Sequence, residues 1–284
     1  MKITVTVNNE EAMLFKDPII KMAKKRGERI KSVEPIILSN ANMAIEYIKK
    51  VVKRRWPKAE KVFANDLRFI DNYVSIFRCR IKAFEPAIIK DADAAYDYAC
   101  HVIKGRWPEA EPHIMKDPLK AYWYACHVIG GRWPEAEPTI MEDPRSAYRY
   151  ADDVIKGRWP EAEPHIMQDP EYAYLYAKFT IKGRWPEAEP HIMKDPECAC
   201  WYACEIINGR WFAAEPIILE GGLASYYMEE LQKHCLKSDK AYKHRGRTLR
   251  NERALRNYLI STNPIFKTHM PDSTPLRQDQ LLEV

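Results

Sequence analysis

The sequence predicts an all-α protein, a right-handed α-solenoid of about eight 26-residue repeats with one long and one short helix in each. Two regularities predict this fold. A tryptophan recurs at intervals of 26 residues, at Trp107, Trp133, Trp159, Trp185 and Trp211. A tyrosine recurs at intervals of 25 or 26 residues over a longer stretch, at Tyr47, Tyr73, Tyr98, Tyr124, Tyr150, Tyr176, Tyr202 and Tyr227. Such a period is typical of stacked units, because so short a unit cannot bury its apolar face without neighbours.

Degenerate copies extend the array toward the N-terminus. Trp56 and Ile81 occupy the tryptophan position of these copies, and the Glu-Pro pairs that begin at Glu34 and Glu85 match the pair at Glu111. We therefore expect about eight units between residues 28 and 222. Degenerate copies at an end are typical of solenoids, whose terminal units must cover the core.

The longer helix of each unit is predicted from its start and stop signals. Asp117 precedes Pro118, and this order favours a helix start because aspartate caps free backbone N–H groups and a first-position proline loses no hydrogen bond. Apolar residues at helical spacing then extend the helix to Ile129. A residue that tolerates a positive φ should end it, in the pair Gly130–Gly131 or the equivalent pair Lys156–Gly157.

The shorter helix begins at Trp107, where a proline and two glutamates follow in the first turn. That composition suits the positive end of a helix dipole. Pro112 removes an N–H close to this start and disfavours a helical conformation at Glu111. We therefore expect a short, kinked or two-part helix that ends near Met115.

Four parts are expected along the chain. These are an N-terminal cap with a partial repeat (1–27), the repeat array (28–222), a basic helical C-terminal cap (223–260) with a helical stretch over Lys233–Tyr258, and an extended tail (261–284). The chain has no run of 18 apolar residues and no N-terminal signal pattern, so we expect no membrane association. The 7 cysteines lie within helical patterns, which favours a reduced, cytoplasmic compartment.

The repeated text resembles a tandem helical repeat of bacteriophage and environmental-virus proteins. The resemblance is carried by the motif Arg-Trp-Pro-Glu-Ala-Glu-Pro, followed by Asp-Pro-x-x-Ala-Tyr-x-Tyr-Ala, and covers residues 80–222 well and residues 28–79 weakly. It implies a helical repeat and a viral origin, and hence a place in the cytoplasm of a host cell or in a virion. It implies no reaction and no catalytic residues.

No pattern in the chain indicates catalysis, a cofactor or a metal. His113, His165 and His191 share one position of the repeat, but successive units should lie about 10 Å apart, too far for shared metal ligation. The paired glutamates occur identically in four units, whereas catalytic pairs are singular and asymmetric. We interpret them as architecture, in ladders with the repeated arginines along the array, and expect a non-enzymatic protein.

The positions that differ between repeats suggest where a partner binds. Position 120 and the positions three and seven residues later lie on one face of the long helix, and their occupants change from unit to unit. We predict a protein-binding stripe formed by Trp123, His127, Arg149, Tyr172, Leu175, Phe179 and Trp201, since exposed aromatic and arginine side chains are typical of contact sites. Two alternatives are a solvated face that varies freely and partial burial beneath the neighbouring short helix.

The charge pattern offers a second hypothesis. Residues 16–61 hold 14 Lys/Arg against 5 Asp/Glu, residues 62–232 hold 19 against 28, and residues 233–256 hold 9 against 2. The two basic ends could bind nucleic acid, whereas the acidic centre would not. The predicted contacts at the C-terminal end are Lys237, Lys240, Lys243, Arg245, Arg247, Arg250 and Arg253.

Overall fold

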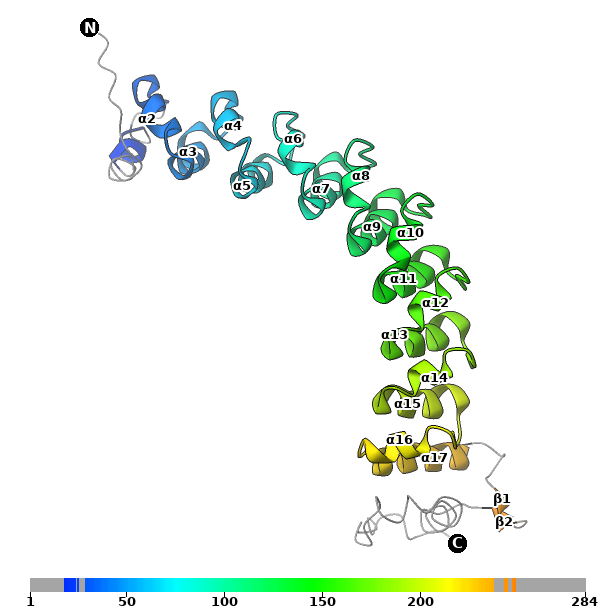
Figure 1. Ribbon diagram of the computed structural model, residues 1–284. Helices are drawn as coiled ribbons and strands as arrows, with labels where there is room; N and C mark the ends of the chain where they lie inside the picture. Colours follow the sequence, from blue (N-terminus) through cyan, green and yellow to red (C-terminus); the bar gives the residue numbers. More distant parts are fainter. Residues whose placement is uncertain (1–17, 24, 26–28, 238–242, 245–246, 249–284) are drawn as a thin grey trace. The chain divides into compact units, whose positions relative to one another are not determined.

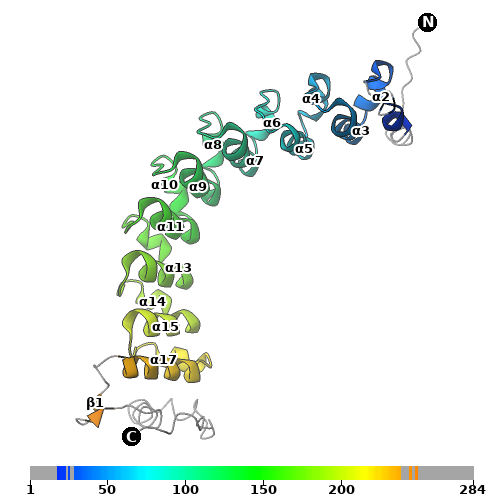
Figure 2. The ribbon, with the colours of Figure 1, turned by 180° about the vertical axis from the view of Figure 1, so that it is seen from behind.

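The computed structural model describes residues 18–23, 25, 29–237, 243–244 and 247–248. It confirms an all-helical repeat architecture of alternating short and long helices (Figures 1 and 2). The chain divides into two compact units, Met1–Ile140 and Met141–Val284, and each is described by itself. No helix in the described part of the chain has the length and apolar character that crossing a bilayer requires.

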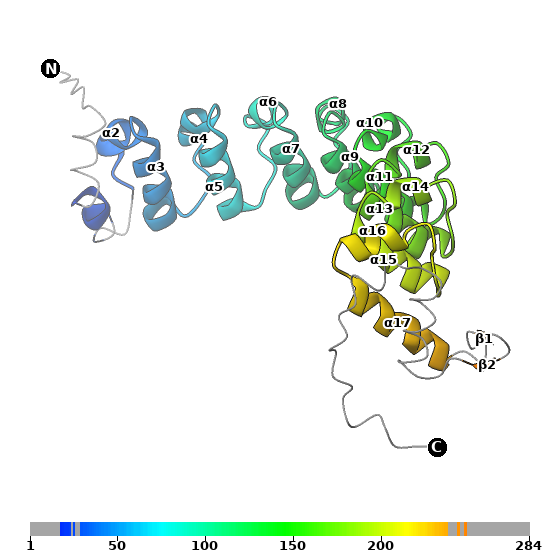
Figure 3. The same ribbon diagram turned by 60° about the horizontal axis from the view of Figure 1, so that its bottom comes forward.

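Unit 1 contains two rows of helices, with α2, α4, α6 and α8 in one row and α3, α5, α7 and α9 in the other (Figure 3). Its short elements are η1 (Lys31–Val33), α2 (Glu34–Leu38), α4 (Pro57–Phe63), α6 (Glu85–Ile88) and α8 (Glu111–Ile114). Its long elements are α3 (Ala41–Tyr47) with η2 (Ile48–Val52), α5 (Leu67–Phe77), α7 (Ala92–Tyr98) with η3 (Ala99–Ile103), and α9 (Pro118–Tyr124) with η4 (Ala125–Ile129). Helix α10 (Glu137–Met141) spans the boundary to unit 2.

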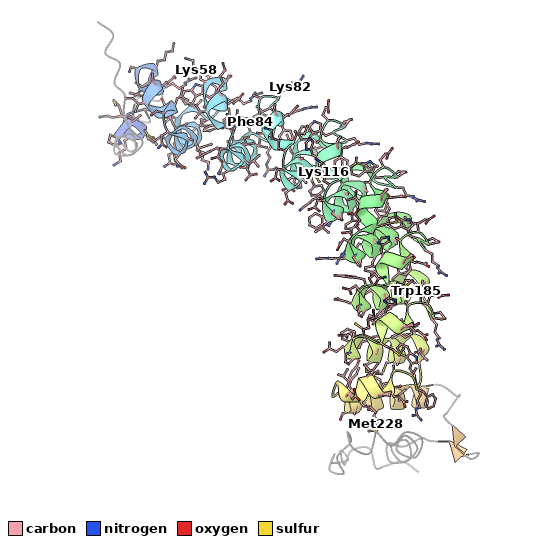
Figure 4. All side chains as sticks on the ribbon, viewed as in Figure 1. Lys58, Lys82, Phe84, Lys116, Trp185 and Met228 are labelled. Atoms are coloured by element: carbon pink, nitrogen blue, oxygen red, sulfur yellow. The ribbon has the colours of Figure 1, made fainter. Side chains whose placement is uncertain are left out.

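Unit 2 repeats the alternation. Its long elements are α11 (Pro144–Tyr150) with η5 (Ala151–Ile155), α13 (Pro170–Leu175) with η6 (Tyr176–Ile181), and α15 (Pro196–Tyr202) with η7 (Ala203–Ile207). Its short elements are α12 (Glu163–Ile166), α14 (Glu189–Ile192) and α16 (Glu215–Glu220), followed by α17 (Ala224–Lys237). The large aromatic residues of the repeat, such as Trp185 (Figure 4), are buried.

Each long helix begins as the sequence predicts. The Asp117 side chain accepts a hydrogen bond of 2.9 Å from the backbone N–H of Lys120, and Pro118 stands at the first helical position. Equivalent side-chain caps occur at Asn40, Asp66, Asp91, Asp143, Asp169 and Asp195. These caps satisfy backbone donors that would otherwise have no partner, and they fix where each helix starts.

The last turn of most long helices is a π turn, which periodicity alone did not predict. In α9–η4 the N–H of Gly130 donates to the carbonyl oxygen of Ala125 at 2.9 Å, five residues earlier. The residue after the π turn has a positive φ, at Lys53, Lys104, Gly130, Lys156, Lys182 and Asn208. In the pair Lys156–Gly157, the residue with the positive φ is therefore Lys156 and not the glycine. A side chain added at Gly157 would meet no atom within 4 Å.

Helix α5 lacks the π turn. The N–H of Arg78, with φ of 45°, donates to the carbonyl oxygen of Val74, only four residues earlier. The helix therefore reaches its left-handed residue one position sooner than its neighbours do. This missing residue explains why Tyr73 and Tyr98 are 25 residues apart and not 26.

The short helix of the later repeats has two parts, as the position of Pro112 predicts, whereas α4 is continuous from Pro57 to Phe63. The N–H groups of Ala110 and Glu111 both donate to the carbonyl oxygen of Trp107, at 2.9 and 3.1 Å, and form a single turn. Helix α8 then begins at Glu111, with Pro112 inside its first turn. Because a first-turn N–H has no intrahelical acceptor, the proline loses nothing there.

The end of unit 2 partly differs from the predicted cap. Helix α17 ends at Lys237, and β1 (Lys243–His244) pairs antiparallel with β2 (Arg247–Thr248). The predicted continuous helix over 233–258 is therefore wrong at these four residues.

Candidate protein-binding surface

The residues that recur in every repeat form a polar network in which the tyrosine is buried and most of the arginines are about half exposed. In the repeat that contains Trp107, Arg106 donates from Nε and Nη2 to the two carboxylate oxygens of Glu111, both at 2.8 Å. The same pair, five residues apart, recurs as Arg29–Glu34, Arg55–Glu60, Arg80–Glu85, Arg132–Glu137, Arg158–Glu163, Arg184–Glu189 and Arg210–Glu215. Each pair lies within one repeat, so the expected ladder along the array is wrong. The eight copies do match the expected number of repeats.

The constant tyrosine joins this pair to the backbone. The hydroxyl of Tyr124 accepts a 2.6 Å hydrogen bond from the N–H of Trp107 and donates to Glu111 at 3.0 Å. Equivalent N–H to hydroxyl bonds link residue 30 to Tyr47, 56 to Tyr73, 81 to Tyr98, 159 to Tyr176, 185 to Tyr202 and 211 to Tyr227. The Tyr124 ring also packs 5.1 Å from the Trp133 ring of the next repeat. The tyrosine thus joins consecutive repeats.

The network shifts the pKa values of its members in opposite directions. Hydrogen bonds from Arg106 lower the pKa of the Glu111 carboxyl; burial opposes this effect, and the Tyr124 hydroxyl adds to it. Burial raises the pKa of Tyr124 to about 12, although the bond from the Trp107 N–H acts in the other direction. At neutral pH the network therefore holds a carboxylate and a neutral phenol.

The variable positions of unit 1 form a cluster with the preceding long helix. The Trp123 ring lies 5.8 Å from the ring of Tyr96, and the ammonium of Lys120 lies 4.3 Å above Trp123. Lys120 also pairs with Asp93, and the Tyr96 hydroxyl lies 2.9 Å from Nδ1 of His127. Trp123 is half-buried and His127 is exposed. The preceding long helix contributes to the cover over Trp123 through Tyr96.

Unit 2 carries a cluster of the same design. The Trp201 ring lies 5.8 Å from the Tyr174 ring, and the Tyr174 hydroxyl donates to Glu205. Lys178 pairs with Glu205 at 2.5 Å and lies 5.1 Å from the ring of Phe179. Phe179 is 45% exposed, among the most exposed large apolar side chains of the described residues.

The remaining predicted stripe residues also lie on the long helices of unit 2. Tyr172 and Leu175 are half-buried, and the Tyr172 ring lies 6.2 Å from the ring of Tyr148. Arg149 is exposed on α11. The structure therefore places the stripe on one type of helix and groups it by neighbouring repeats.

A second tyrosine of the repeat contacts the variable positions and is absent from the predicted stripe. Tyr96, Tyr148 and Tyr174 each lie two residues before the constant tyrosine and contact the variable residues of the next long helix. Their recurrence is visible in the sequence, as the first tyrosine of the Tyr-x-Tyr motif. A residue on one helix contacts a neighbouring helix about one repeat later, and a search within single repeats cannot find that pairing.

A groove opens between α5 and α7 in unit 1. Its volume is about 1020 Å³, and Leu67, Ile70, Asp71, Val74 and Arg78 line one wall. The other wall comes from α7 and η3, including Asp97, His101, Val102 and Lys104. His127 and Asp93 also line it, so the groove adjoins the cluster around Trp123.

The groove lies where the aromatic pair that joins α7 to α9 and α13 to α15 is missing. Tyr96 lies two residues before Tyr98, and its partner Trp123 lies one residue before Tyr124. The equivalent positions on α5 and α7 hold Asp71 and Asp97. Two carboxylates neither fill the space of two aromatic rings nor favour a close approach, because like charges repel. The two substitutions therefore account for the open groove.

Other candidate chemistry finds no support among the described residues, where no group of three or more His, Cys, Asp or Glu side chains could hold a metal ion. No disulfide joins the six cysteines with described side chains, and Cys198, Cys200 and Cys204 are buried. Burial raises the pKa of the Cys198 thiol, which makes it a poor nucleophile.

The predicted nucleic-acid contacts fall mostly outside the described residues. Lys240, Arg245, Arg250 and Arg253 lie there, and Lys237, Lys243 and Arg247 are placed only as the end of α17 and as members of β1 and β2. Comparison with protein-family models, curated proteins and solved structures finds no match for this chain. The resemblance to bacteriophage repeat proteins stays a prediction.

Proposed function

We propose that this chain is a non-catalytic helical-repeat scaffold that binds another protein through its long-helix face. One observation carries the proposal. The constant tryptophans and tyrosines of the repeats are buried, whereas the variable side chains of the long helices are mostly half-buried or exposed, Ser146 and Cys198 excepted. The interior thus specifies the fold, and the variable face is free to specify a partner. Following the viral resemblance, we propose a host factor or a virion component as that partner.

The clusters around Trp123 and Trp201 suit this role physically. Each tryptophan is held against a tyrosine of the preceding helix at 5.8 Å. A side chain already fixed in place loses little conformational freedom when a partner binds, and this lowers the cost of association. Trp and Arg are also the residue types that most often dominate binding energy. Phe179 adds an exposed apolar anchor.

Quantitative capture of partners by the tagged full-length chain tests the proposal. The double variant Trp123→Ala/Phe179→Ala should lose most of the proteins that the wild-type chain recovers. A matched control, Glu109→Ala/Glu187→Ala, changes two exposed residues that lie outside the long helices, and it should recover the same proteins as the wild type. Thermal unfolding of both variants distinguishes a lost surface from a lost fold. Equal recovery by the folded double variant and the wild type would refute the proposal.

A second candidate function is nucleic-acid binding, favoured by the first repeats of unit 1. Lys49, Lys53, Arg54, Lys58 and Lys61 are all exposed there, and Lys58 (Figure 4) takes the position that Glu109 holds in a later repeat. Such a surface would bind phosphates with an affinity that falls steeply with salt. Titration of labelled double-stranded DNA and RNA at 50 and 200 mM salt tests this candidate. The wild-type chain should bind far more weakly at 200 mM than at 50 mM salt, and the variant Lys58→Glu/Lys61→Glu should bind weakly at both concentrations. An affinity that does not change with salt would refute nucleic-acid binding.

A further inference from the structure

We propose that the groove between α5 and α7 is a docking site for a basic amphipathic helix. The inference rests on the proposed function and names the chemical class of the partner for one site. Lysine or arginine side chains of the partner would lie between Asp71 and Asp97, and its apolar stripe would cover the floor of the groove.

The length of the groove suits a helix. Its α5 wall runs from Leu67 to Arg78, which corresponds to about 17 Å at a rise of about 1.5 Å per residue. The volume of about 1020 Å³ lies at the upper end of the range for small-ligand pockets, about 300–1,000 Å³. An elongated groove between two helices is the usual receptor for an amphipathic helix, which inserts side chains spaced by one turn.

The floor of the groove is apolar. Ile70 and Ile88 are buried beneath it, and Leu67, Val74 and Val102 are half-buried along it. In the neighbouring pair of long helices, α7 and α9, this space is filled by the rings of Tyr96 and Trp123. The floor of the groove therefore has no covering side chain of its own between α5 and α7, and a partner's apolar stripe would supply one.

The charges at the rim select a basic partner. Asp71 and Asp97 are exposed on opposite walls, and within the described part of the chain neither has an ion-pair partner. Asp93, which also lines the groove, already pairs with Lys120. A cationic side chain between Asp71 and Asp97 would relieve their repulsion, whereas an acidic peptide or a nucleic-acid backbone would increase it.

Arg78 and Lys104 are cations that would repel a basic side chain of the partner. Both follow the last turn of their helices and both line the groove. We therefore expect the partner's basic residues to be confined to the middle of its helix and to be absent from the end beside Arg78.

The probe for the test is a fluorescein-labelled helical peptide with leucines on one face and lysines on the other. Its length is 14 residues, which is about four helical turns. Binding to the full chain is measured by fluorescence anisotropy. The control peptide carries glutamate in place of each lysine. We expect the lysine peptide to bind the wild-type chain and the glutamate peptide to bind at least about tenfold more weakly.

Two variants locate the binding. Asp71→Asn/Asp97→Asn should weaken the lysine peptide about tenfold, whereas the matched control Glu109→Gln/Glu135→Gln removes the same charge outside the groove and should leave binding unchanged. Asp71→Tyr/Asp97→Trp restores the aromatic pair of the next two helices, so it should abolish binding and raise the midpoint of thermal unfolding. The rise in thermal stability shows that this variant is folded.

Three results would overturn the inference: no binding of the lysine peptide to the wild type, equal binding of the two peptides, or unchanged binding to the Asp71→Asn/Asp97→Asn variant. Failure of the groove and failure of the scaffold are distinguishable. If the groove variants behave like the wild type while Trp123→Ala/Phe179→Ala still loses captured proteins, the groove inference alone is wrong. If that double variant loses no captured protein while the lysine peptide still depends on Asp71 and Asp97, only the variable stripe is refuted.

Discussion

Substitution of Tyr124 by phenylalanine tests the network that joins the repeats. The ring would remain beside Trp133, 5.1 Å away, but the hydroxyl would be lost. The N–H of Trp107, bonded at 2.6 Å in the wild type, would then be buried without an acceptor. Glu111 would lose one donor and keep its two bonds from Arg106.

The expected loss of stability follows from these two bonds. A buried backbone donor without a partner costs about 1–3 kcal/mol, and a hydrogen bond to a charged acceptor contributes about 1.5–3 kcal/mol. Part of the second amount is recovered, because Arg106 still satisfies the carboxylate. We therefore expect Tyr124→Phe to lower the free energy of unfolding by about 3 kcal/mol. The control Tyr148→Phe removes a hydroxyl that makes no hydrogen bond among the described residues, and should cost less than about 0.5 kcal/mol.

Urea unfolding followed by circular dichroism measures the free-energy change, and hydrogen exchange at the Trp107 amide reports the local effect. Exchange matters because repeat arrays do not always unfold in one step. The variant amide should exchange much faster than the wild-type amide, while amides of distant repeats should be unaffected. A cost below about 1 kcal/mol together with preserved protection of Trp107 would refute the role that we assign to the hydroxyl.

Three further predictions concern backbone conformation and pH. Lys104 has a φ of 58°, so Lys104→Gly should raise the free energy of unfolding by about 1 kcal/mol and Gly130→Lys should lower it by a similar amount, measured by thermal unfolding. A side chain at Gly221 would collide with Cβ of Pro196 and lie 2.9 Å from its Cγ, so Gly221→Ala should lower the free energy of unfolding by about 1–3 kcal/mol. The control is Gly157→Ala, whose added side chain would meet no atom within 4 Å, measured by the same thermal unfolding. The pKa of Glu111 is lowered in the folded protein, so its contribution to stability is present above the unfolded pKa of about 4.3 and is lost as pH falls through the folded pKa. The pKa of Tyr124 is raised to about 12, so its contribution is present below pH of about 10 and is lost as pH rises toward 12. Unfolding midpoints measured across pH should show both losses; Glu111→Gln should remove the acidic one and Tyr124→Phe the alkaline one.

The sequence was sufficient for the architecture because the determinants of each helix are local. Asp117 and Pro118 set a start within two residues, and the pairing of Arg106 with Glu111 spans five. The left-handed position at Lys156 and the π turn before it could not be predicted, because helical periodicity does not distinguish an α turn from a π turn. Lysine is also not a residue that usually marks a positive φ.

The candidate surface was predicted less completely, because its contacts join different repeats. Trp123 and Trp201 were recognised as variable residues of a helix face, but the partners Tyr96 and Tyr174 come from the preceding long helices. The groove was not predicted either, because it also depends on how neighbouring long helices pair. Asp71 and Asp97 are ordinary exposed aspartates within their own helices, and only the pairing of neighbouring long helices shows that they replace two aromatic rings.

Two departures from the repeat thus coincide at α5 and α7. The helix α5 lacks the residue that would form a π turn and is followed directly by the left-handed Arg78, and Asp71 and Asp97 stand at the positions of the aromatic pair. Each change removes packing found elsewhere in the array, namely the π turn of most other long helices and the aromatic pair of α7–α9 and α13–α15. Retaining both leaves unit 1 with an apolar floor and a charged rim, at a position where the fold itself requires neither. Residues that weaken packing without a structural gain are most readily explained by binding, and for this reason we place a basic helix of the partner in this groove, beside the cluster around Trp123.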